Sequence, residues 1–338
     1  MISPASQPLR LYSTCPQSKD IPAADYLGTV IAHTRWSDDA GFAGMLVYTD
    51  NGIVDPWPVA QVVLQNSRRL RPLVAVQPIY RPPYTAAKMV ATFGLLHGRG
   101  VALNMLAGGF RNDLVALGDT TPHDDRYVRT TEYTLILRRL LDDSGPVSFA
   151  GRYYTVNNLT LTPALPRELL PDILISGSSD AGMKAAQDIG AVAVRYPRPP
   201  EEEDDADQRY DVPCGIRVGI ISRHDAGEAW RIAQARFPDD RKGAIRHRLA
   251  MTVSDSAWHQ QLSTLGERAA SETPYWLGPF QRSQTFCPYL VGAYDTVAAE
   301  LARYMTKGYR SFILDIVPSA EEFAHIKTVF DKALERAA

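Results

Sequence analysis

The stretch "DILISGSSDAGMKAAQDIGAVAVR", residues 172–195, predicts a strand, a helix and a second strand in immediate succession. The apolar run Ile173–Ile175 ends in Ser-Gly-Ser-Ser, and an alanine-rich helix is predicted over residues 179–189. A second apolar run, residues 191–195, follows at once. Such a strand–helix–strand unit is typical of parallel sheets that helices cover.

The same alternation extends along most of the chain. Eight nearly all-apolar strands are expected, at residues 9–13, 44–48, 71–77, 101–105, 173–175, 191–195, 215–221 and 312–315. Helices are expected at residues 25–40, 59–66, 85–97, 126–141, 179–189, 227–236, 296–307 and 320–336. Eight βα units in 338 residues favour an α/β protein with a (β/α)8 TIM barrel, in which residues 1–338 form a single domain. The competing doubly wound sheet lacks the GxGxxG that would follow its first strand.

Three segments interrupt this rhythm. Residues 147–161 are rich in aromatic and β-branched residues, which predicts a hairpin-like excursion around Asn157–Asn158. Residues 197–213 hold four prolines and, within Glu201–Asp207, six acidic residues, so we expect a solvated, mobile acidic loop there. Residues 238–290 are predicted to form an insertion before the last βα unit, over the C-terminal mouth of the barrel, where TIM-barrel enzymes carry their active sites.

Composition excludes several classes of protein. The net charge of −2, with 22% charged residues of both signs, opposes a nucleic-acid-binding or membrane-binding surface. Three cysteines without a CxxC motif oppose a disulfide framework or a metal site and fit a reducing cytoplasm. Neither a signal peptide pattern nor an apolar run of about 20 residues is present, so we expect a cytoplasmic protein.

Polar residues gather where the predicted strands end. Asp50 follows the second strand, Asn104 ends the fourth and Arg217 lies within the seventh. In a TIM barrel these positions share the face that carries function. Asn104 is either a turn residue or a ligand contact, and Arg217 is either part of a structural ion pair or points into the barrel mouth.

Two predicted helix N-termini carry groups that bind anions. At the first, Ser179 or Asp180 is either a simple N-cap or part of a phosphate site, because free backbone N–H groups at a helix start attract anions. The second lies in "PHDDRYVRTTEYTLILRRL", residues 122–140, where a helix is expected to begin near Arg126. Asp124 or Asp125 is its predicted cap, and His123 is expected just outside the helix. Arg126 and Tyr127 offer a guanidinium and a hydroxyl, so we expect one phosphate to be shared between the two helices.

Several motifs resemble those of the bacterial luciferase-like flavin monooxygenases, with the alkanesulfonate monooxygenases as the nearest branch. The similar stretches are "LNMLAGGF" (103–110), "HDDRYVRTTEYTLILRRLL" (123–141), "FAGRYYTV" (149–156), "SGSSDAGMKAAQDIG" (176–190) and "LVGAYDTVAAELARYMTKGYRSFIL" (290–314). The resemblance extends over residues 9–330. It implies an enzyme that uses O2 and reduced FMN, which a separate NAD(P)H:flavin reductase supplies, and a homo-oligomer, either a dimer or a tetramer.

The resemblance also implies roles for individual residues. The implied cofactor-binding residues are Asn104, Arg126, Tyr127, Gly177, Ser178, Ser179 and Asp50. Asn104, Arg217 and Asp50 are the implied catalytic residues. Two alternatives stay open: a reduced deazaflavin could replace FMN on the same fold, or the chain could bind flavin without catalysis.

The chain departs from the alkanesulfonate branch at three aligned positions, Ile53, Gly219 and Val317, where that branch carries a cysteine, a histidine and a tyrosine. Since a sulfonate requires cationic and hydrogen-bonding partners, we expect a different, larger and less anionic substrate. The residues expected to line its pocket are Cys15, Ile53, Trp57, Gly219 and Val317. Each of them could equally belong to the core.

Overall fold

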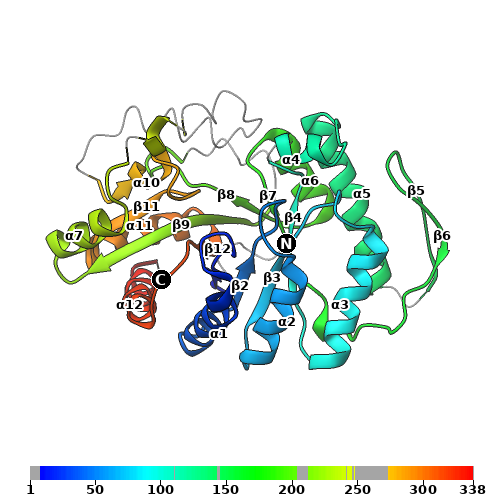
Figure 1. The fold of residues 1–338 in the computed structure, drawn as a ribbon, viewed down its shortest axis with the longest axis horizontal. Coiled ribbons are helices and arrows are strands. Elements are labelled where there is room, and N and C mark those ends of the chain that lie inside the picture. Colours follow the sequence, from blue (N-terminus) through cyan, green and yellow to red (C-terminus); the bar gives the residue numbers. More distant parts are fainter. Residues whose placement is uncertain are drawn as a thin grey trace.

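A closed barrel of parallel strands forms the centre of the molecule (Figure 1). The computed structural model describes residues 8–109, 111–142, 145–203, 212–240, 242–245, 247 and 273–337. In order around the barrel, the eight strands are β1 (Arg10–Thr14), β2 (Gly44–Val47), β3 (Arg71–Val76), β4 (Ala102–Leu106), β7 (Ile173–Ser176), β8 (Val192–Arg195), β9 (Cys214–Arg223) and β12 (Tyr309–Leu314). Pairing of β12 with β1 closes the barrel, which confirms the predicted TIM barrel.

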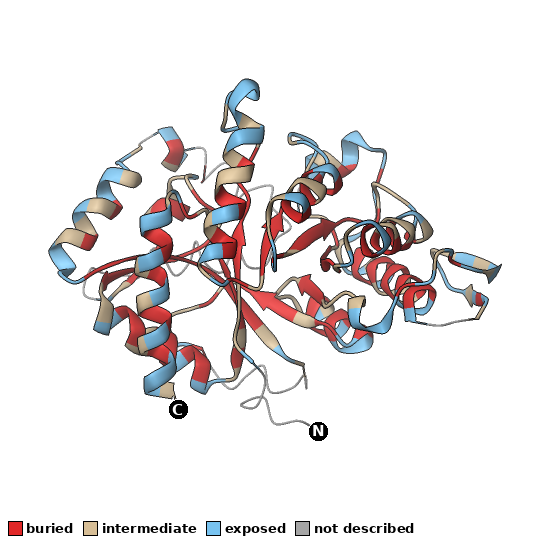
Figure 2. Ribbon diagram, turned by 90° about the horizontal axis from the view of Figure 1, so that it is seen from below, coloured by how far each residue is buried: buried red, intermediate tan, exposed pale blue. Residues whose placement is uncertain are grey.

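Helices surround the barrel, with their buried faces toward the strands and their exposed faces outward (Figure 2). The predicted helices are present as α1 (Ala23–Asp39), α2 (Pro56–Asn66), α3 (Pro83–His97), α5 (His123–Asp142), α6 (Asp180–Ile189), α7 (Ala226–Arg236), α11 (Tyr294–Thr306) and α12 (Ala320–Ala337). The short α4 (Arg111–Ala116), α10 (Gly278–Gln281) and 3-10 helix η2 (Arg167–Leu169) were not predicted. In α4 only Leu114 is buried, which is too little apolar periodicity to be recognised in sequence.

Strand β9 is shared between the barrel and a second group of strands. Its first half pairs with β8 and β12, whereas Gly219–Arg223 pairs with β11 (Tyr289–Ala293). In turn β11 pairs antiparallel with the two-residue β10 (Tyr275–Trp276). The ring of Tyr289 lies where a Cβ on Gly219 would stand, so this crossing requires glycine. Neither β10 nor β11 was predicted.

The barrel interior is filled by one buried side chain from each of seven strands. They are Tyr12, Leu46, Leu73, Ala102, Leu174, Val194 and Ile313. Because side chains alternate along a strand, the neighbouring positions face outward and pack against the helices. Three of the interior residues, Leu46, Val194 and Ile313, also form the floor of a large cavity above them.

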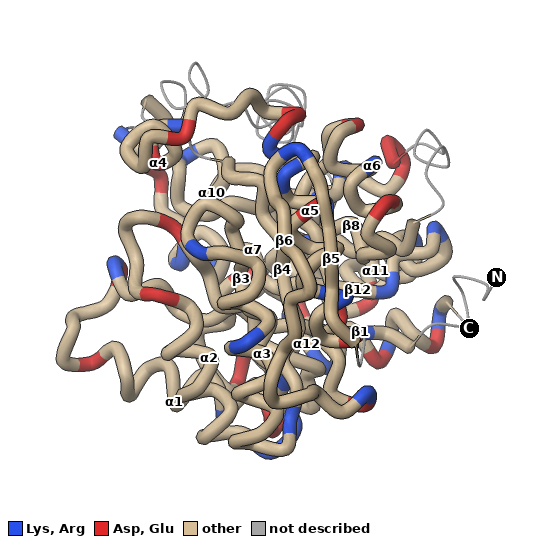
Figure 3. The backbone as a smooth tube through the Cα atoms, turned by 90° about the vertical axis from the view of Figure 1, so that its right-hand side faces the viewer, with Lys and Arg blue, Asp and Glu red and all other residues tan. Residues whose placement is uncertain are grey.

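The predicted excursion is a two-stranded hairpin, β5 (Val147–Ala150) and β6 (Thr155–Leu159), which Figure 3 shows lying along the outside of the molecule. Its turn was predicted wrongly, because Asn157–Asn158 lies within β6 and the chain reverses at 151–154. Two carboxylate oxygens of Glu132 on α5 accept hydrogen bonds from backbone N–H groups of this turn, at 2.7–3.1 Å. Asn158 has a left-handed φ of 51°, which explains its turn-like sequence signal.

Glu203 anchors the acidic loop within its described residues 197–203. Glu203 is only 4% exposed, and its carboxylate accepts a hydrogen bond from the Tyr309 hydroxyl at 3.1 Å. An Arg195 nitrogen lies 4.0 Å from the same carboxylate, so the buried charge has an ionic partner. Glu203 thus departs from the expectation of a solvated loop, whereas Glu201 and Glu202 are exposed, and residues 204–211 lie outside the described ones.

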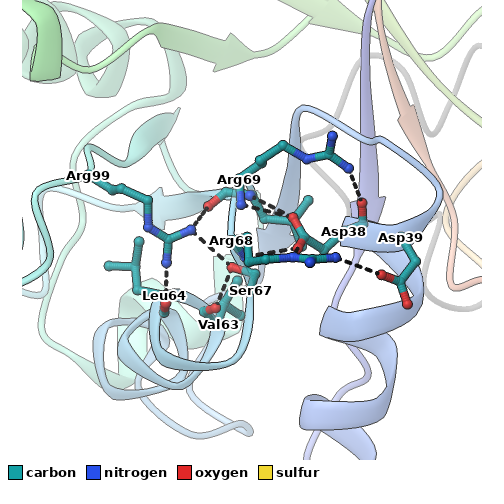
Figure 4. Close-up of polar contacts among 9 residues, drawn as sticks. Asp38, Asp39, Val63, Leu64, Ser67, Arg68, Arg69 and Arg99 are labelled. Atoms are coloured by element: carbon teal, nitrogen blue, oxygen red, sulfur yellow. Dashed lines mark hydrogen bonds and ion pairs between the residues drawn. The ribbon is translucent and has the colours of Figure 1, made fainter.

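At the end of α1, Asp38 joins that helix to the loop between α2 and β3 (Figure 4). Its carboxylate accepts hydrogen bonds from the backbone N–H groups of Arg68, Arg69 and Leu70, at 2.8, 2.9 and 3.2 Å. Burial alone would raise the pKa of Asp38, but these donors outweigh burial and lower it. This loop leads into the N-terminal ends of the strands, where TIM-barrel residues serve stability.

Charges of both signs are interspersed along the side of the molecule drawn in Figure 3. Among the described helices, none combines the length and apolarity needed to cross a membrane. Within the same part of the chain, no three His, Cys, Asp or Glu side chains come together in a group that could hold a metal ion.

Candidate active site

A large cavity opens at the carboxyl ends of the barrel strands. It encloses about 1320 Å³ of empty space, counted out to open solvent. Its walls come from β4 and β9 and from the segments that follow β1, β2, β3, β4 and β7.

The structure brings the predicted cofactor-binding residues together at this cavity, although they come from segments far apart in sequence. Those that line it are Asp50, Asn104, Arg126, Tyr127, Gly177, Ser178 and Ser179. Arg217 lines it as well. The polar residues predicted at strand ends and helix starts therefore share one cavity.

The two serines that precede α6 differ in their contacts. Ser179 is the N-cap, and its Oγ accepts a hydrogen bond from the Gly182 N–H at 3.2 Å, so the capping alternative holds for this residue. The Oγ of Ser178 is buried at the cavity and has no hydrogen-bond partner among the described residues. Leaving a buried hydroxyl without a hydrogen bond costs free energy, so a ligand that accepts or donates one at Ser178 would remove this cost.

Helix α5 begins earlier than predicted. His123 is its first residue, so Asp124 and Asp125 lie in its first turn instead of capping it. Pro122 explains the difference, because its carbonyl oxygen accepts the Arg126 N–H at 3.0 Å and adds a turn before Arg126. The two aspartates remain favourably placed against the positive end of the helix dipole.

Arg126 and Tyr127 are both buried in this first part of α5. An Arg126 Nη1 donates to the carbonyl oxygen of Thr121 at 3.0 Å, which fixes the guanidinium at the cavity wall. Burial raises the pKa of the Tyr127 hydroxyl, and a hydrogen bond with Ser179 partly offsets this, so the hydroxyl is neutral and able to donate. The Tyr127 hydroxyl also lies where a Cβ on Gly177 would stand, so only glycine fits there.

Asn104 and Asp50 occupy other parts of the wall. The Ser176 hydroxyl donates to Asn104 Oδ1 at 3.0 Å, which ties β4 to β7 and orients the Asn104 amide at the cavity. Asp50 closes a turn at the rim, because its Oδ1 accepts the Gly52 N–H at 2.6 Å. Asn104 thus has a hydrogen-bond partner within the protein and also lines the cavity.

Arg217 both forms a structural ion pair and lines the cavity, which are the two alternatives expected for it. Its Nη2 lies 3.5 Å from Asp315 Oδ1, and its guanidinium carbon lies 4.7 Å from the centroid of the Tyr48 ring. Asp315 accepts further hydrogen bonds from the Thr285 hydroxyl at 2.5 Å and the Tyr289 hydroxyl at 2.8 Å. This buried network holds the guanidinium at the cavity.

Tyr48 and Gln77 also line the cavity and were not singled out from the sequence, and Gln17, one of the polar residues after the first predicted strand, lines it as well. The Oε1 of Gln17 and the hydroxyl of Tyr48 are buried and have no hydrogen-bond partner among the described residues. Each of the three lies directly after, or within three residues of, the end of a barrel strand. A polar side chain at the end of an apolar strand was therefore the available signal.

The predicted substrate-pocket residues do not line the large cavity. Cys15 and Ile53 adjoin one small separate cavity, and Gly219 and Val317 adjoin another. Trp57 is 1% exposed and packs in the core. The five residues therefore do not share one cavity, and Cys15, Trp57 and Val317 belong to the core clusters.

The fold and the position of the cavity define a TIM-barrel enzyme. The model of the luciferase-like monooxygenase family matches residues 11–311. The chain is 36% identical over 313 residues to the 4-(γ-L-glutamylamino)butanoyl-[BtrI acyl-carrier protein] monooxygenase BtrO of Niallia circulans, which covers 90% of this chain and 91% of the relative. The chain belongs to the luciferase-like monooxygenase family.

Solved structures of other proteins share the fold. The long-chain alkane monooxygenase LadA superposes with a TM-score of 0.74 at 16% identity, covering 98% of this chain and 92% of LadA. An F420-dependent secondary alcohol dehydrogenase superposes with a TM-score of 0.65 at 17% identity, covering 97% of this chain and 99% of that protein. At these identities the likeness concerns the fold alone.

Proposed function

We propose that this enzyme oxygenates an organic substrate with O2 and reduced FMN, which a separate NAD(P)H:flavin reductase supplies. Membership of the luciferase-like monooxygenase family supports the reaction class. The observation that carries a phosphate-bearing flavin as the cofactor is the buried, unpartnered Ser178 hydroxyl at the N-terminus of α6, in a cavity that Arg126 also lines.

The residues present fit a bound phosphate. Ser178 offers a hydroxyl, the N-terminus of α6 offers backbone N–H groups, and Arg126 offers a cation on the same cavity wall. A helix N-terminus attracts negative charge through its dipole, and charge-assisted hydrogen bonds are stronger than neutral ones. Gly177 leaves room for the Tyr127 hydroxyl beside the start of α6, so this hydroxyl can lie close to a phosphate held there.

The same cavity fits a planar ring system beyond the phosphate. Asn104 presents an amide to it, and Leu46, Val194 and Ile313 provide an apolar floor. A reduced flavin bound there would supply the electrons for activation of O2. The task of the chain is to hold the ring with Asn104 and to exclude water through the apolar floor.

We further propose that the substrate is not a simple alkanesulfonate. Arg126 and Arg217 are the described Arg and Lys side chains at the cavity, and both are committed, Arg126 to the phosphate end and Arg217 to Asp315. A sulfonate would therefore find no uncompensated cation. The relative BtrO is named for an acyl group on a carrier protein, which makes carrier-borne acyl groups the first candidates to assay.

A deazaflavin-dependent reaction is the second candidate, and only the fold shared with the F420-dependent dehydrogenase favours it. Anaerobic titration of the protein with reduced FMN, oxidised FMN and a reduced deazaflavin separates the two. We expect micromolar affinity for reduced FMN and weaker binding of the others, followed by O2 uptake when a reductase is present. Tighter binding of the deazaflavin than of reduced FMN would exclude the proposal.

A further inference from the structure

At a second end of the cavity, three polar side chains carry atoms that have no hydrogen-bond partner in the described part of the chain. Buried atoms without a hydrogen-bond partner among the described residues are found here on three cavity residues: Gln17 Oε1, the Tyr48 hydroxyl and Arg217 Nε. Gln17 and Tyr48 are close neighbours, because both also line the same small cavity beside the large one. Arg217 covers the Tyr48 ring at 4.7 Å.

This end lies opposite the phosphate end. Around the barrel, β9, β12, β1 and β2 are consecutive, and Arg217, Gln17 and Tyr48 belong to β9 or follow β1 and β2. The Asn104–Ser176 hydrogen bond lies on the other side, on β4 and β7. In a barrel of eight strands these two groups face each other across the lumen. A cofactor held by its phosphate near β7 thus leaves the second end for the substrate.

The charge of the second end is balanced. Arg217 supplies one positive charge, and Asp315, at 3.5 Å, supplies one negative charge. The Tyr289 and Thr285 hydroxyls hold the Asp315 carboxylate in place from its other side. An anionic ligand would add an uncompensated charge in a buried site, whereas a neutral polar ligand would not.

The unused groups also have a definite hydrogen-bonding character. Arg217 Nε is a donor, Gln17 Oε1 is an acceptor, and the Tyr48 hydroxyl can donate or accept. A neutral ligand that pairs with all three must offer an acceptor oxygen and a donor hydrogen, as a carboxamide does. We propose that Gln17, Tyr48 and Arg217 form a subsite that binds a neutral amide group of the substrate, with Asp315 as a positioning residue for Arg217.

This inference rests on the proposed function, because it assigns the second end to the substrate of the same site. Binding of small probes without flavin tests it separately. The probes are hexanamide, hexanoate and 1-hexanesulfonate, titrated against the full chain by saturation-transfer NMR. We expect hexanamide to bind at least about fivefold more tightly than either anion, the effect of about one hydrogen bond.

Variants separate the subsite from the phosphate end. Tyr48→Phe should weaken hexanamide binding about fivefold and leave FMN binding unchanged, whereas Ser178→Ala should do the reverse. Tyr294→Phe is the matched control, because its hydroxyl bonds to His325 at 2.6 Å on the outside of the barrel. Asp315→Asn leaves Arg217 uncompensated and should shift preference toward hexanoate.

The outcomes are distinct. Equal or tighter binding of hexanoate to the unaltered protein would overturn the amide subsite, as would an unchanged hexanamide affinity in Tyr48→Phe. Neither result touches the FMN titration, whose failure would instead remove the proposed function. If Asp315→Asn does not fold by circular dichroism, the Tyr48→Phe comparison alone decides.

Discussion

The Oγ of Ser179 accepts the hydrogen bond of the Gly182 N–H at 3.2 Å, so this serine closes the first turn of α6. Its neighbour Ser178 also lines the cavity, and its buried hydroxyl has no hydrogen-bond partner among the described residues. One residue of the pair therefore builds the helix and the other is left for a ligand. Substituting each serine separately should therefore affect protein stability differently.

Ser179→Ala should lower the free energy of unfolding by about 1 kcal/mol, because it removes an N-cap. Ser178→Ala should change that free energy by less than about 0.5 kcal/mol, because its hydroxyl has no partner to lose. Urea titrations of the two variants check this. Equal losses of stability would show that the division of tasks is wrong.

Gly177→Ala should destabilise the protein and weaken FMN binding, because its Cβ would meet the Tyr127 hydroxyl. Removing that hydroxyl with Tyr127→Phe should restore part of the lost stability in the double variant. Thermal unfolding of the two single variants and the double variant measures this coupling. Simple additivity of the two changes would argue against the contact.

Stability should fall in mild acid because of His33. Burial lowers the pKa of this imidazole from 6.5 to about 4. The unfolded chain therefore binds the proton more readily, so the contribution is complete above pH 6.5 and is lost as the pH falls toward 4. The loss is on the order of 3 kcal/mol. His33→Gln should flatten this part of the stability curve, and a slope unchanged by that substitution would contradict the assignment.

Much of the fold follows from local signals in the sequence. The eight barrel strands were recognisable because each is a short apolar run with a helix or turn behind it. Strands β10 and β11 were not, because β10 has two residues and β11 pairs with the outer half of β9. Which strand a segment pairs with depends on contacts distant in sequence.

Polar residues of the cavity were recognisable from the sequence where they follow a strand or begin a helix, but not where contacts distant in sequence decide their position. Gly219 lies two residues after Arg217 and would face the same lumen if β9 stayed in the barrel. Strand β9 instead leaves the barrel at Gly219 to pair with β11, which removes this position from the cavity. The unpartnered atoms of Gln17 and Tyr48 were equally out of reach, because a missing hydrogen bond can be recognised only in three dimensions.

Alkanesulfonates should not be desulfonated. With reduced FMN supplied by a reductase, sulfite release from a series of alkanesulfonates should not exceed the flavin-only background. The reason is the pairing of Arg217 with Asp315, which leaves no free cation for the sulfonate. Sulfite formed well above that background would show that the enzyme acts on alkanesulfonates and would contradict this prediction.

The most direct test of the account compares FMN with riboflavin, which lacks only the phosphate, on the same variants. Ser178→Ala should weaken binding of reduced FMN by about 1 kcal/mol and Arg126→Ala by about 2 kcal/mol, through a neutral and a charged donor. Riboflavin binding should be nearly unchanged by both. A parallel loss of riboflavin and FMN binding would contradict a phosphate site at α6, and with it the choice of FMN.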